Sequence, residues 1–231
     1  MKTAIVTGAS SGIGAAITSM LLTEGYEVFG FGRSFDESFV SQHELFHPIQ
    51  CDLMKINELT EKLKEIKKKH SIHLLVNNAG VGYYGPHEEL SPAKIHAMVT
   101  TNLEVPMVLS QLLLRDLKKN KGTILNISSV TAKKSNTYGC AYGATKAGLS
   151  SFSASLFDEV RKYGVKVVTL HPDMTKTNLY RNANFCEGDT MDSYLLPEEV
   201  ASACQMILHA RDGLVVTDLT IQPQLHKLTK R

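Results

Sequence analysis

The chain has 231 residues, of which 43% are hydrophobic and 21% charged, enough to bury one sizeable core. Its 25 basic and 23 acidic side chains nearly balance, at a formal charge of +2, so no net field attracts nucleic acid or an anionic membrane. The basic runs 67–69 and 227–231 are interpreted as solvated faces of a helix and of the tail. A small-molecule partner is therefore expected, with no nucleic acid and no membrane.

The cysteines lie far apart, at Cys51, Cys140, Cys186 and Cys204, with no paired spacing. This pattern indicates neither a zinc site nor a redox dithiol, and no metal is expected. The first predicted strand begins at Thr3, which leaves no room for a signal sequence, and no apolar run approaches the roughly 20 residues of a membrane span. We therefore expect a cytoplasmic protein.

Short apolar, β-branched runs alternate with longer segments of helical period along the whole chain. The predicted strands are Thr3–Thr7, Glu27–Phe31, Leu45–Gln50, His73–Asn77, Gly122–Ser128, Lys166–Leu170 and Leu214–Ile221. This alternation is typical of βαβ units and a parallel sheet, so the sequence predicts an α/β fold. No linker or repeat interrupts the pattern, and residues 1–231 are expected to form a single domain.

The first strand runs directly into a glycine-rich loop, Thr7-Gly8-Ala9-Ser10-Ser11-Gly12-Ile13-Gly14, and then into an amphipathic helix. In this context backbone N–H groups and the helix N-terminus together hold a pyrophosphate. Gly8 permits the turn, Gly12 lets the backbone approach the phosphates, and Gly14 lets the helix pack on the sheet. A turn kept for packing alone is the alternative, but the strand–loop–helix context favours a dinucleotide site.

The second predicted strand leads into Gly32-Arg33, and this pair bears on the choice of cofactor. A site for NAD needs a carboxylate here to accept from the ribose 2′-hydroxyl, whereas an arginine accommodates the 2′-phosphate of NADP. Gly32 occupies the expected acidic position and Arg33 follows it. The pair favours NADP over NAD, the alternative being a solvated arginine in a loop.

Ser91-Pro92 is predicted to open a long helix that runs towards Lys118. Pro106 lies four residues after Asn102 and has no N–H to give to the Asn102 carbonyl. We expect the helix to kink there and the carbonyl to be left free. A proline that merely bends the helix around the core is the alternative.

Tyr142 and Lys146 lie four residues apart in a segment of helical character, so their side chains share one helix face. A nearby ammonium favours the phenolate and lowers the pKa of a tyrosine, which makes Tyr142 a candidate general acid and base. Ser129 follows the strand that contains Ile124 to Ile127, at the strand end where open α/β sheets bind ligands. Its hydroxyl is a candidate for polarising a substrate carbonyl.

Several of these motifs, in order over nearly the whole chain, resemble those of the short-chain dehydrogenase/reductase family. TGASSGIG resembles its cofactor loop, Asn77-Asn78-Ala79-Gly80 its NNAG element, and Ser129 with Tyr142-Gly-Ala-Thr-Lys146 its Ser…Tyr-x-x-x-Lys centre. The resemblance implies a Rossmann-type, doubly wound parallel sheet of about seven strands with helices on both faces. It also implies a homodimer or homotetramer that pairs through the helices ending near Lys118 and beginning near Tyr138.

The resemblance further implies roles for individual residues. The implied catalytic set is Asn102, Ser129, Tyr142 and Lys146, with the Asn102 carbonyl holding a water that connects to the lysine. The implied cofactor contacts, with Arg33, are Gly8, Ser10, Ser11, Gly12, Ile13, Gly14, Asp52, Leu53, Asn78, Ala79, Gly80, Tyr142, Lys146, Pro172, Thr175 and Thr177. The rival serine, Ser128, fits the family's spacing to the tyrosine less well and is assigned to the backbone or the cofactor.

Three positions leave questions open. Asp52 resembles the family's adenine-contacting aspartate, but an N-cap for the following helix explains it equally well. Asp173 stands where the family has glycine; because aspartate tolerates turn geometry, we expect the loop with Thr175 and Thr177 to survive. His171, which closes a strand, is interpreted as structural.

The leading hypothesis is an NADP(H)-dependent oxidoreductase that interconverts a carbonyl and an alcohol, with Tyr142 as general acid and base. A catalytically inactive nucleotide-binding sensor or scaffold of the same fold is the alternative, and the complete Asn, Ser, Tyr and Lys set argues against it. Epimerases and dehydratases that share Tyr-x-x-x-Lys resemble longer chains. The residues expected to line or cover the substrate pocket are Tyr83, Tyr84, Val130, Thr131, Tyr138 and 178–194.

Overall fold

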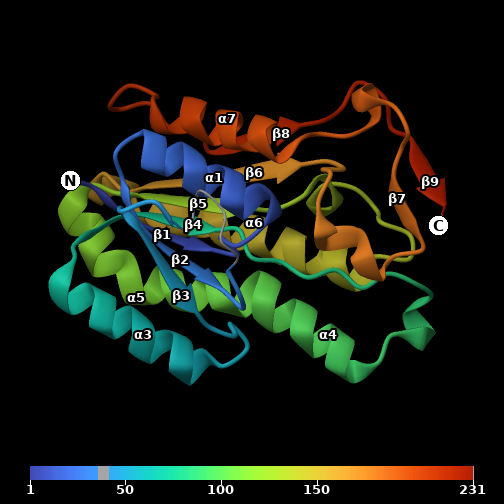
Figure 1. The fold of residues 1–231 in the computed structure, drawn as a ribbon, viewed down its shortest axis with the longest axis horizontal. Coiled ribbons are helices and arrows are strands. Elements are labelled where there is room, and N and C mark those ends of the chain that lie inside the picture. The colour runs from blue at the N-terminus through green and yellow to red at the C-terminus, as the bar shows by residue number, and fades with distance from the viewer. Residues whose placement is uncertain (36–41, 231) are drawn as a thin grey trace.

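The computed structural model describes residues 1–35 and 42–230, which build a seven-stranded parallel sheet (Figure 1). Its strands, in spatial order, are β3 (Phe46–Gln50), β2 (Glu27–Gly32), β1 (Thr3–Thr7), β4 (Ile72–Asn77), β5 (Thr123–Ile127), β6 (Lys166–Pro172) and β8 (Asp218–Ile221). All neighbouring strands pair in parallel. The order reverses at β1, the topological switch of a doubly wound sheet, so the predicted Rossmann-type fold is confirmed.

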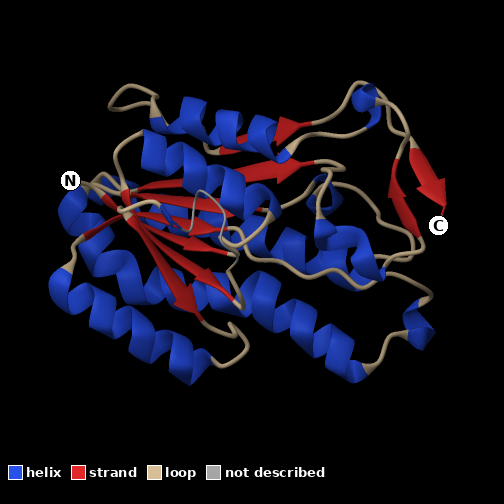
Figure 2. Cartoon of the chain, in the orientation of Figure 1, coloured by secondary structure: helices blue, strands red, loops and turns tan. Residues whose placement is uncertain are grey.

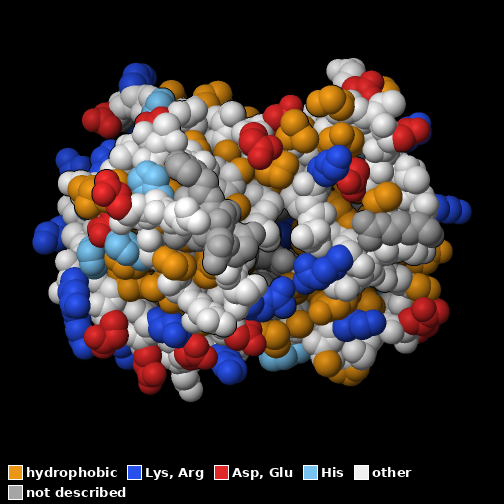
Figure 3. Space-filling view, viewed as in Figure 1, with side chains coloured by type: hydrophobic (Ala, Val, Ile, Leu, Met, Phe, Trp, Pro, Cys, Tyr) orange, Lys and Arg blue, Asp and Glu red, His pale blue; other side chains and the backbone are white. Residues whose placement is uncertain are grey.

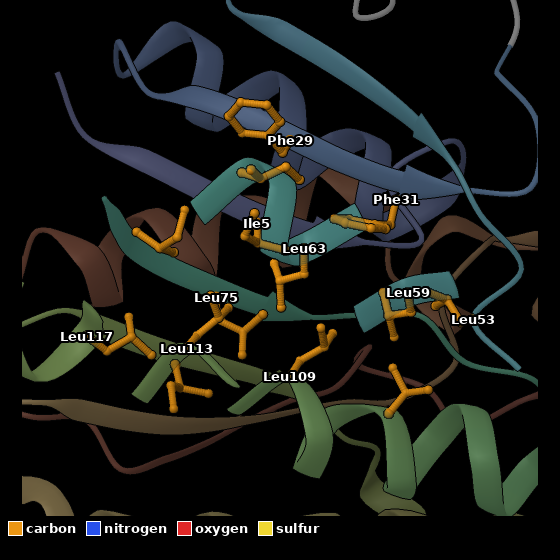
Figure 4. Close-up of a cluster of buried hydrophobic side chains, with 14 of the residues drawn as sticks. Ile5, Phe29, Phe31, Leu53, Leu59, Leu63, Leu75, Leu109, Leu113 and Leu117 are labelled. Atoms are coloured by element: carbon orange, nitrogen blue, oxygen red, sulfur yellow. The ribbon is translucent and has the colours of Figure 1, made fainter. Parts of the chain in front are cut away.

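Helices cover both faces of the sheet. Helix α1 (Gly12–Thr23) and helix α7 (Pro197–Leu208) lie together on one face, and α3 (Ile56–Lys69), α5 (Val105–Asn120) and α6 (Cys140–Val160) lie on the other (Figures 1 and 2). Alternate strand residues point to opposite faces, so Ile5 joins the core under α3 and α5, while Ala4 and Val6 join the core under α1 and α7. Figure 4 shows the first of these two cores.

The long helix predicted from Ser91 consists of three parts. Helix α4 (Pro92–Val99) is capped by the Ser91 side chain, as predicted, and the π-helical turn Thr100–Glu104 joins it to α5. In that turn the Val105 N–H bonds the Thr100 carbonyl, which inserts an extra residue where a kink was expected. By length and composition the whole stretch could cross a membrane (mean hydropathy 1.3), but half of its most apolar window is buried in the protein.

Two features differ from the sequence prediction. The predicted strand Leu214–Ile221 begins only at Asp218, and Val215 and Val216 pack on the core without joining a strand. A separate antiparallel pair, β7 (Phe185–Glu187) and β9 (Leu228–Lys230), was not predicted, because strands of three residues have no readable period (Figure 2). The C-terminal run is thus not a free tail: it anchors the segment 178–194.

Candidate active site

The carboxyl ends of the central strands open onto one cavity that contains nearly every predicted site residue. Its lining includes Gly8, Ser10, Ser11, Gly12, Ile13, Arg33, Asp52, Leu53, Asn78, Ala79, Gly80, Ser129, Tyr142, Lys146, Pro172, Thr175 and Thr177. Of the predicted set, Gly14 and Asn102 lie outside the described lining and pack behind it. The space-filling view in Figure 3 shows a hollow near the centre of the face that is turned towards the viewer.

The glycine loop forms one end of the cavity, and its backbone explains its glycines. Gly8 and Gly12 adopt left-handed φ angles of 67° and 53°, which glycine reaches without steric cost. A Cβ at Gly14 would lie 2.0 Å from the Gly8 carbonyl oxygen, so only glycine lets α1 start this close to the loop. Among the described residues no side chain caps the N-terminus of α1 at Ser11, and its positive end faces the loop. The loop therefore fits a phosphate group.

The turn after β4 is tied to the end of β1. The Asn78 side chain donates to the carbonyls of Thr7 (2.9 Å) and Gly8 (3.3 Å). The backbone N–H groups of Asn78 and Ala79 in turn bond the Thr7 hydroxyl, at 3.0 and 3.1 Å. Thr7, which sequence reasoning did not select, therefore holds the Asn-Ala-Gly turn against the glycine loop.

Asn102 acts on a neighbouring loop rather than on the cavity. Its side chain accepts from the Val81 N–H and donates to the Val81 carbonyl, both at 2.9 Å, and donates to the Thr145 hydroxyl at 3.1 Å. The residue is fully buried in the π-helical turn. This side chain joins the chain after β4 to α6, the helix that carries Tyr142.

Tyr142, Lys146 and Ser129 meet at the other end of the cavity, all buried. Helix α6 places Tyr142 and Lys146 one turn apart, and the Tyr142 hydroxyl faces the Ser129 side chain closely enough to affect its pKa. The Lys146 ammonium donates to the Ile127 carbonyl at 2.8 Å and lies 5.9 Å from the centre of the Tyr142 ring. A hydroxyl pair above a buried cation can polarise a carbonyl and transfer a proton.

Burial dominates the acid–base properties of this pair. It raises the pKa of Tyr142 to about 12, partly opposed by the hydrogen bond to Ser129. It lowers the pKa of Lys146 to about 8, because the buried ammonium loses its hydration. The expectation that the lysine controls the tyrosine pKa is therefore wrong for this arrangement, in which loss of solvent is the largest effect. Tyr142 keeps its proton at neutral pH, as a general acid must.

The two neighbouring serines face different partners. The Ser128 hydroxyl donates to the Lys146 carbonyl at 3.0 Å and lies 3.0 Å from the Ser150 hydroxyl. The Ser129 hydroxyl accepts from the N–H and hydroxyl of Thr131, at 3.2 and 3.0 Å, and faces Tyr142. This geometry supports Ser129 for the polarising role and Ser128 as a support for α6.

Two side chains lie close to Gly32, the residue before Arg33, and would have to shift to admit a side chain there. A Cβ at Gly32 would lie 2.9 Å from the Phe35 ring and 3.0 Å from the Ser10 hydroxyl oxygen. Arg33 itself is exposed at the edge of the cavity, near Asp52.

Asp52 does not cap the next helix, whose N-cap is Lys55. Its carboxylate instead accepts a hydrogen bond from the Met54 N–H at 3.1 Å. The N-cap interpretation of Asp52 is therefore wrong.

The loop after β6 uses Asp173 as a hydrogen-bond acceptor. Its carboxylate accepts from the Met174 N–H and from the Gln222 side chain, both at 2.8 Å. Its φ is not positive, so the aspartate replaces glycine without left-handed strain. Thr175 donates its hydroxyl to the Asp173 carbonyl at 2.9 Å, and both Thr175 and Thr177 reach the cavity, as expected.

Aromatic side chains surround Tyr142 on the side away from the glycine loop. The Tyr84 ring lies 5.7 Å from that of Tyr142 and 6.0 Å from that of Tyr180. Tyr83 and Tyr180 line the cavity with part of the segment 178–194, as expected for a substrate pocket. The described lining does not include Tyr84, Val130, Thr131 or Tyr138, which were also expected there; Val130 is buried and Tyr138 is 62% exposed on the surface.

Comparison with known proteins agrees with this geometry. A family model described as short chain dehydrogenase matches residues 2–186. The chain is 33% identical to 3-oxoacyl-[acyl-carrier-protein] reductase of Buchnera aphidicola, over 95% of this chain and 94% of that protein. It is also 33% identical to serine 3-dehydrogenase of Agrobacterium fabrum, over 76% of this chain and 72% of that protein.

Among solved structures, an alcohol dehydrogenase from the archaeon Thermococcus sibiricus complexed with 5-hydroxy-NADP superposes with a TM-score of 0.86. It is 28% identical, and the match covers 98% of both chains. The fold is of the Rossmann type, and the family that it matches is one of oxidoreductases. The chain belongs to the short-chain dehydrogenase/reductase family.

Replacing Lys146 with methionine should stabilise the protein at neutral pH while removing a site residue. The pKa of Lys146 falls from 10.5 in the unfolded chain to about 8 in the folded protein. Below pH 8 both states carry the charge, so the full cost of burying it, about 3 kcal/mol, opposes folding. As the pH rises from 8 to 10.5 the folded lysine is neutral first, and this cost disappears.

Chemical denaturation between pH 7 and 10 tests this prediction. The Lys146→Met variant should exceed the wild type in free energy of unfolding at pH 7, and the difference should shrink towards pH 10. Lys68→Met removes the same charge from an exposed site and should give a small, constant difference. A Lys146→Met difference that does not change over this pH range would contradict the assignment of a buried, charged lysine.

Proposed function

We propose that the protein is an NADP(H)-dependent oxidoreductase that interconverts a ketone or aldehyde and the corresponding alcohol. The observation that carries this proposal is one cavity with a phosphate-compatible glycine loop at one end and the buried Ser129, Tyr142 and Lys146 at the other. The bound cofactor would supply or accept the hydride. The protein would orient the substrate and move the proton.

The proton steps are assigned to the residues at the closed end. The Ser129 hydroxyl would donate to the substrate carbonyl oxygen and polarise it, and the protonated Tyr142 would transfer its proton to that oxygen during reduction. Oxidation of the alcohol would use the same groups in reverse. The Lys146 ammonium, 5.9 Å from the ring, would stabilise the phenolate that forms after proton transfer.

An inactive sensor or scaffold remains the rival from another class. The burial of Lys146 argues against this rival. A buried ammonium with a lowered pKa costs stability, and an apolar side chain would fill the same space without that cost. Binding of nucleotide without turnover on any carbonyl would favour this rival.

Removal of the Tyr142 hydroxyl should abolish turnover and leave cofactor binding intact. In Tyr142→Phe the ring still packs, but the proton that reduction needs is lost, so kcat should fall by about 10²–10⁴-fold. Steady-state reduction of a panel of carbonyls, followed at the NADPH absorbance, measures this loss. Tyr163→Phe, at an exposed tyrosine far along the chain, is the matched control and should keep wild-type kcat. A Tyr142→Phe variant with more than about a tenth of wild-type kcat would place the proton donor elsewhere.

NADP preference is supported by Arg33 at the cavity edge and by Gly32, which carries no carboxylate to accept from the ribose 2′-hydroxyl of NAD. The similar alcohol dehydrogenase complexed with 5-hydroxy-NADP is consistent with this choice. Asp52 and Leu53 would contact the adenine side of the cofactor, and Pro172, Thr175 and Thr177 the nicotinamide side.

Arg33→Ala should therefore weaken NADPH binding by about 10–100-fold, the worth of a charge-assisted hydrogen bond, and change NADH binding little. Fluorescence titration with both cofactors measures the two dissociation constants. Arg211→Ala removes the same charge from an exposed site and should leave both constants unchanged. Equal affinity of the wild type for the two cofactors would refute the NADP assignment.

A homodimer or homotetramer is proposed on the apolar faces of α5 and α6. Three leucines of these helices, Leu109, Leu113 and Leu149, are buried in the core and are not available for an interface. Met107, 37% exposed, and Phe152 instead lie together in a surface groove between the two helices.

Sedimentation velocity at micromolar concentration should give a mass of two or four chains, and Met107→Glu should shift it to smaller species. A monomeric wild type would overturn this proposal.

We further propose a single domain over residues 1–231 in the cytoplasm, where four free cysteines stay reduced. One cooperative unfolding transition and recovery in the soluble cell fraction are the corresponding checks.

A further inference from the structure

His171 lies at the end of β6, fully buried directly behind the loop that carries Ser129. Its Nδ1 atom is 3.1 Å from the Ser129 carbonyl oxygen, and its Nε2 atom is 2.8 Å from a carboxylate oxygen of Asp218. The His171 ring is not among the residues that line the cavity in the described part of the chain. It therefore contacts the backbone of a site residue from outside the cavity lining.

Both partners of the ring are hydrogen-bond acceptors. A backbone carbonyl cannot donate, and it has two lone pairs, so Ser129 can accept from His171 as well as from the Ala132 N–H at 3.0 Å. Burial raises the pKa of Asp218, but hydrogen bonds and charge from Lys133 and His171 outweigh it and hold that pKa below its ordinary value. The carboxylate is therefore ionised at neutral pH and also cannot donate.

A neutral imidazole has one N–H and can satisfy only one of these two acceptors. Protons on both ring nitrogens satisfy both, and the ring charge is then paired with the Asp218 carboxylate. The other charged group of this cluster, Lys133, donates to the same carboxylate and to the Thr220 hydroxyl. Asp173, two residues along the chain from His171, has its carboxylate engaged by Met174 and Gln222.

We propose that His171 is a positioning residue for Ser129: protonated on both nitrogens, it clamps the Ser129 carbonyl to the Asp218 carboxylate on edge strand β8. This inference rests on the proposed role of Ser129. Fixing the carbonyl fixes the backbone from which the Ser129 hydroxyl projects towards Tyr142. Lys133, just after the 3-10 helix Val130–Ala132, holds the far end of the same loop to β8. A displacement of about 1 Å at a reacting group can cost up to about a hundredfold in rate.

Asp218→Asn tests the clamp without touching the cavity. Asp218 is about half exposed, so the variant should fold, but an uncharged amide no longer holds the second proton on the ring. The kcat for carbonyl reduction should fall by about 10–100-fold, with the KM of the carbonyl and the cofactor dissociation constant unchanged. Asp158→Asn removes a carboxylate from an exposed pair with Arg161 and should leave kcat unchanged.

Nitrogen-15 NMR of histidine-labelled protein gives a second readout that does not depend on turnover. In the wild type at neutral pH both nitrogens of His171, assigned with His171→Gln, should resonate as protonated nitrogens, and in Asp218→Asn only one should. A neutral His171 ring in the wild type, or wild-type kcat in Asp218→Asn, would overturn the clamp. A wild type that reduces no carbonyl would instead overturn the proposed function, and the NMR result would still decide whether the doubly protonated ring exists.

Discussion

The buried ammonium of Lys146 is the constraint on which the rest of the site depends. It is fixed by one 2.8 Å hydrogen bond to the carbonyl of Ile127, the last residue of β5, and by the helix that also carries Tyr142. A charge in this position is unfavourable for folding, so the surrounding structure has to hold it there. Each neighbouring contact can be understood as part of that support.

Buried polar contacts tie the strands to the helix that holds this charge. Asn77 of β4 donates to the Asn126 side chain of β5 at 2.8 Å, and Asn126 donates to the Ser153 hydroxyl of α6 at 2.7 Å. Asn102 and Ser128 join α6 from two further directions. These bonds restrict how α6 can sit on the sheet, although the Asn77 side-chain oxygen is buried without a partner among the described residues, and they help to fix the direction of the Tyr142 and Lys146 side chains. The buried charge lowers the stability of the fold, and such losses of stability are typical of functional sites.

Local pattern was sufficient to predict the sheet and most of the cavity. Short stretches of sequence identify the glycine loop, the strand ends and the i, i+4 pair of Tyr142 and Lys146. The parallel topology then brings these features together. What could not be predicted depends on contacts between distant segments. The partners of His171 come from positions 129 and 218, and the β7–β9 pair joins residues more than 40 positions apart. Nor could the sequence tell that burial, rather than the lysine charge, would dominate the pKa of Tyr142.

The fate of the transferred hydrogen tests hydride transfer in this cavity most directly. The enzyme would be incubated with each of the two forms of NADPH that carry deuterium on one face of nicotinamide carbon 4, together with a carbonyl that it reduces. Mass spectrometry and NMR of the product alcohol then locate the label. If hydride passes from the cofactor to the substrate in this cavity, one of the two forms gives one deuterium on the former carbonyl carbon, and the hydroxyl proton comes from solvent. A product without deuterium from either form, or label found only in water, would contradict hydride transfer in this cavity.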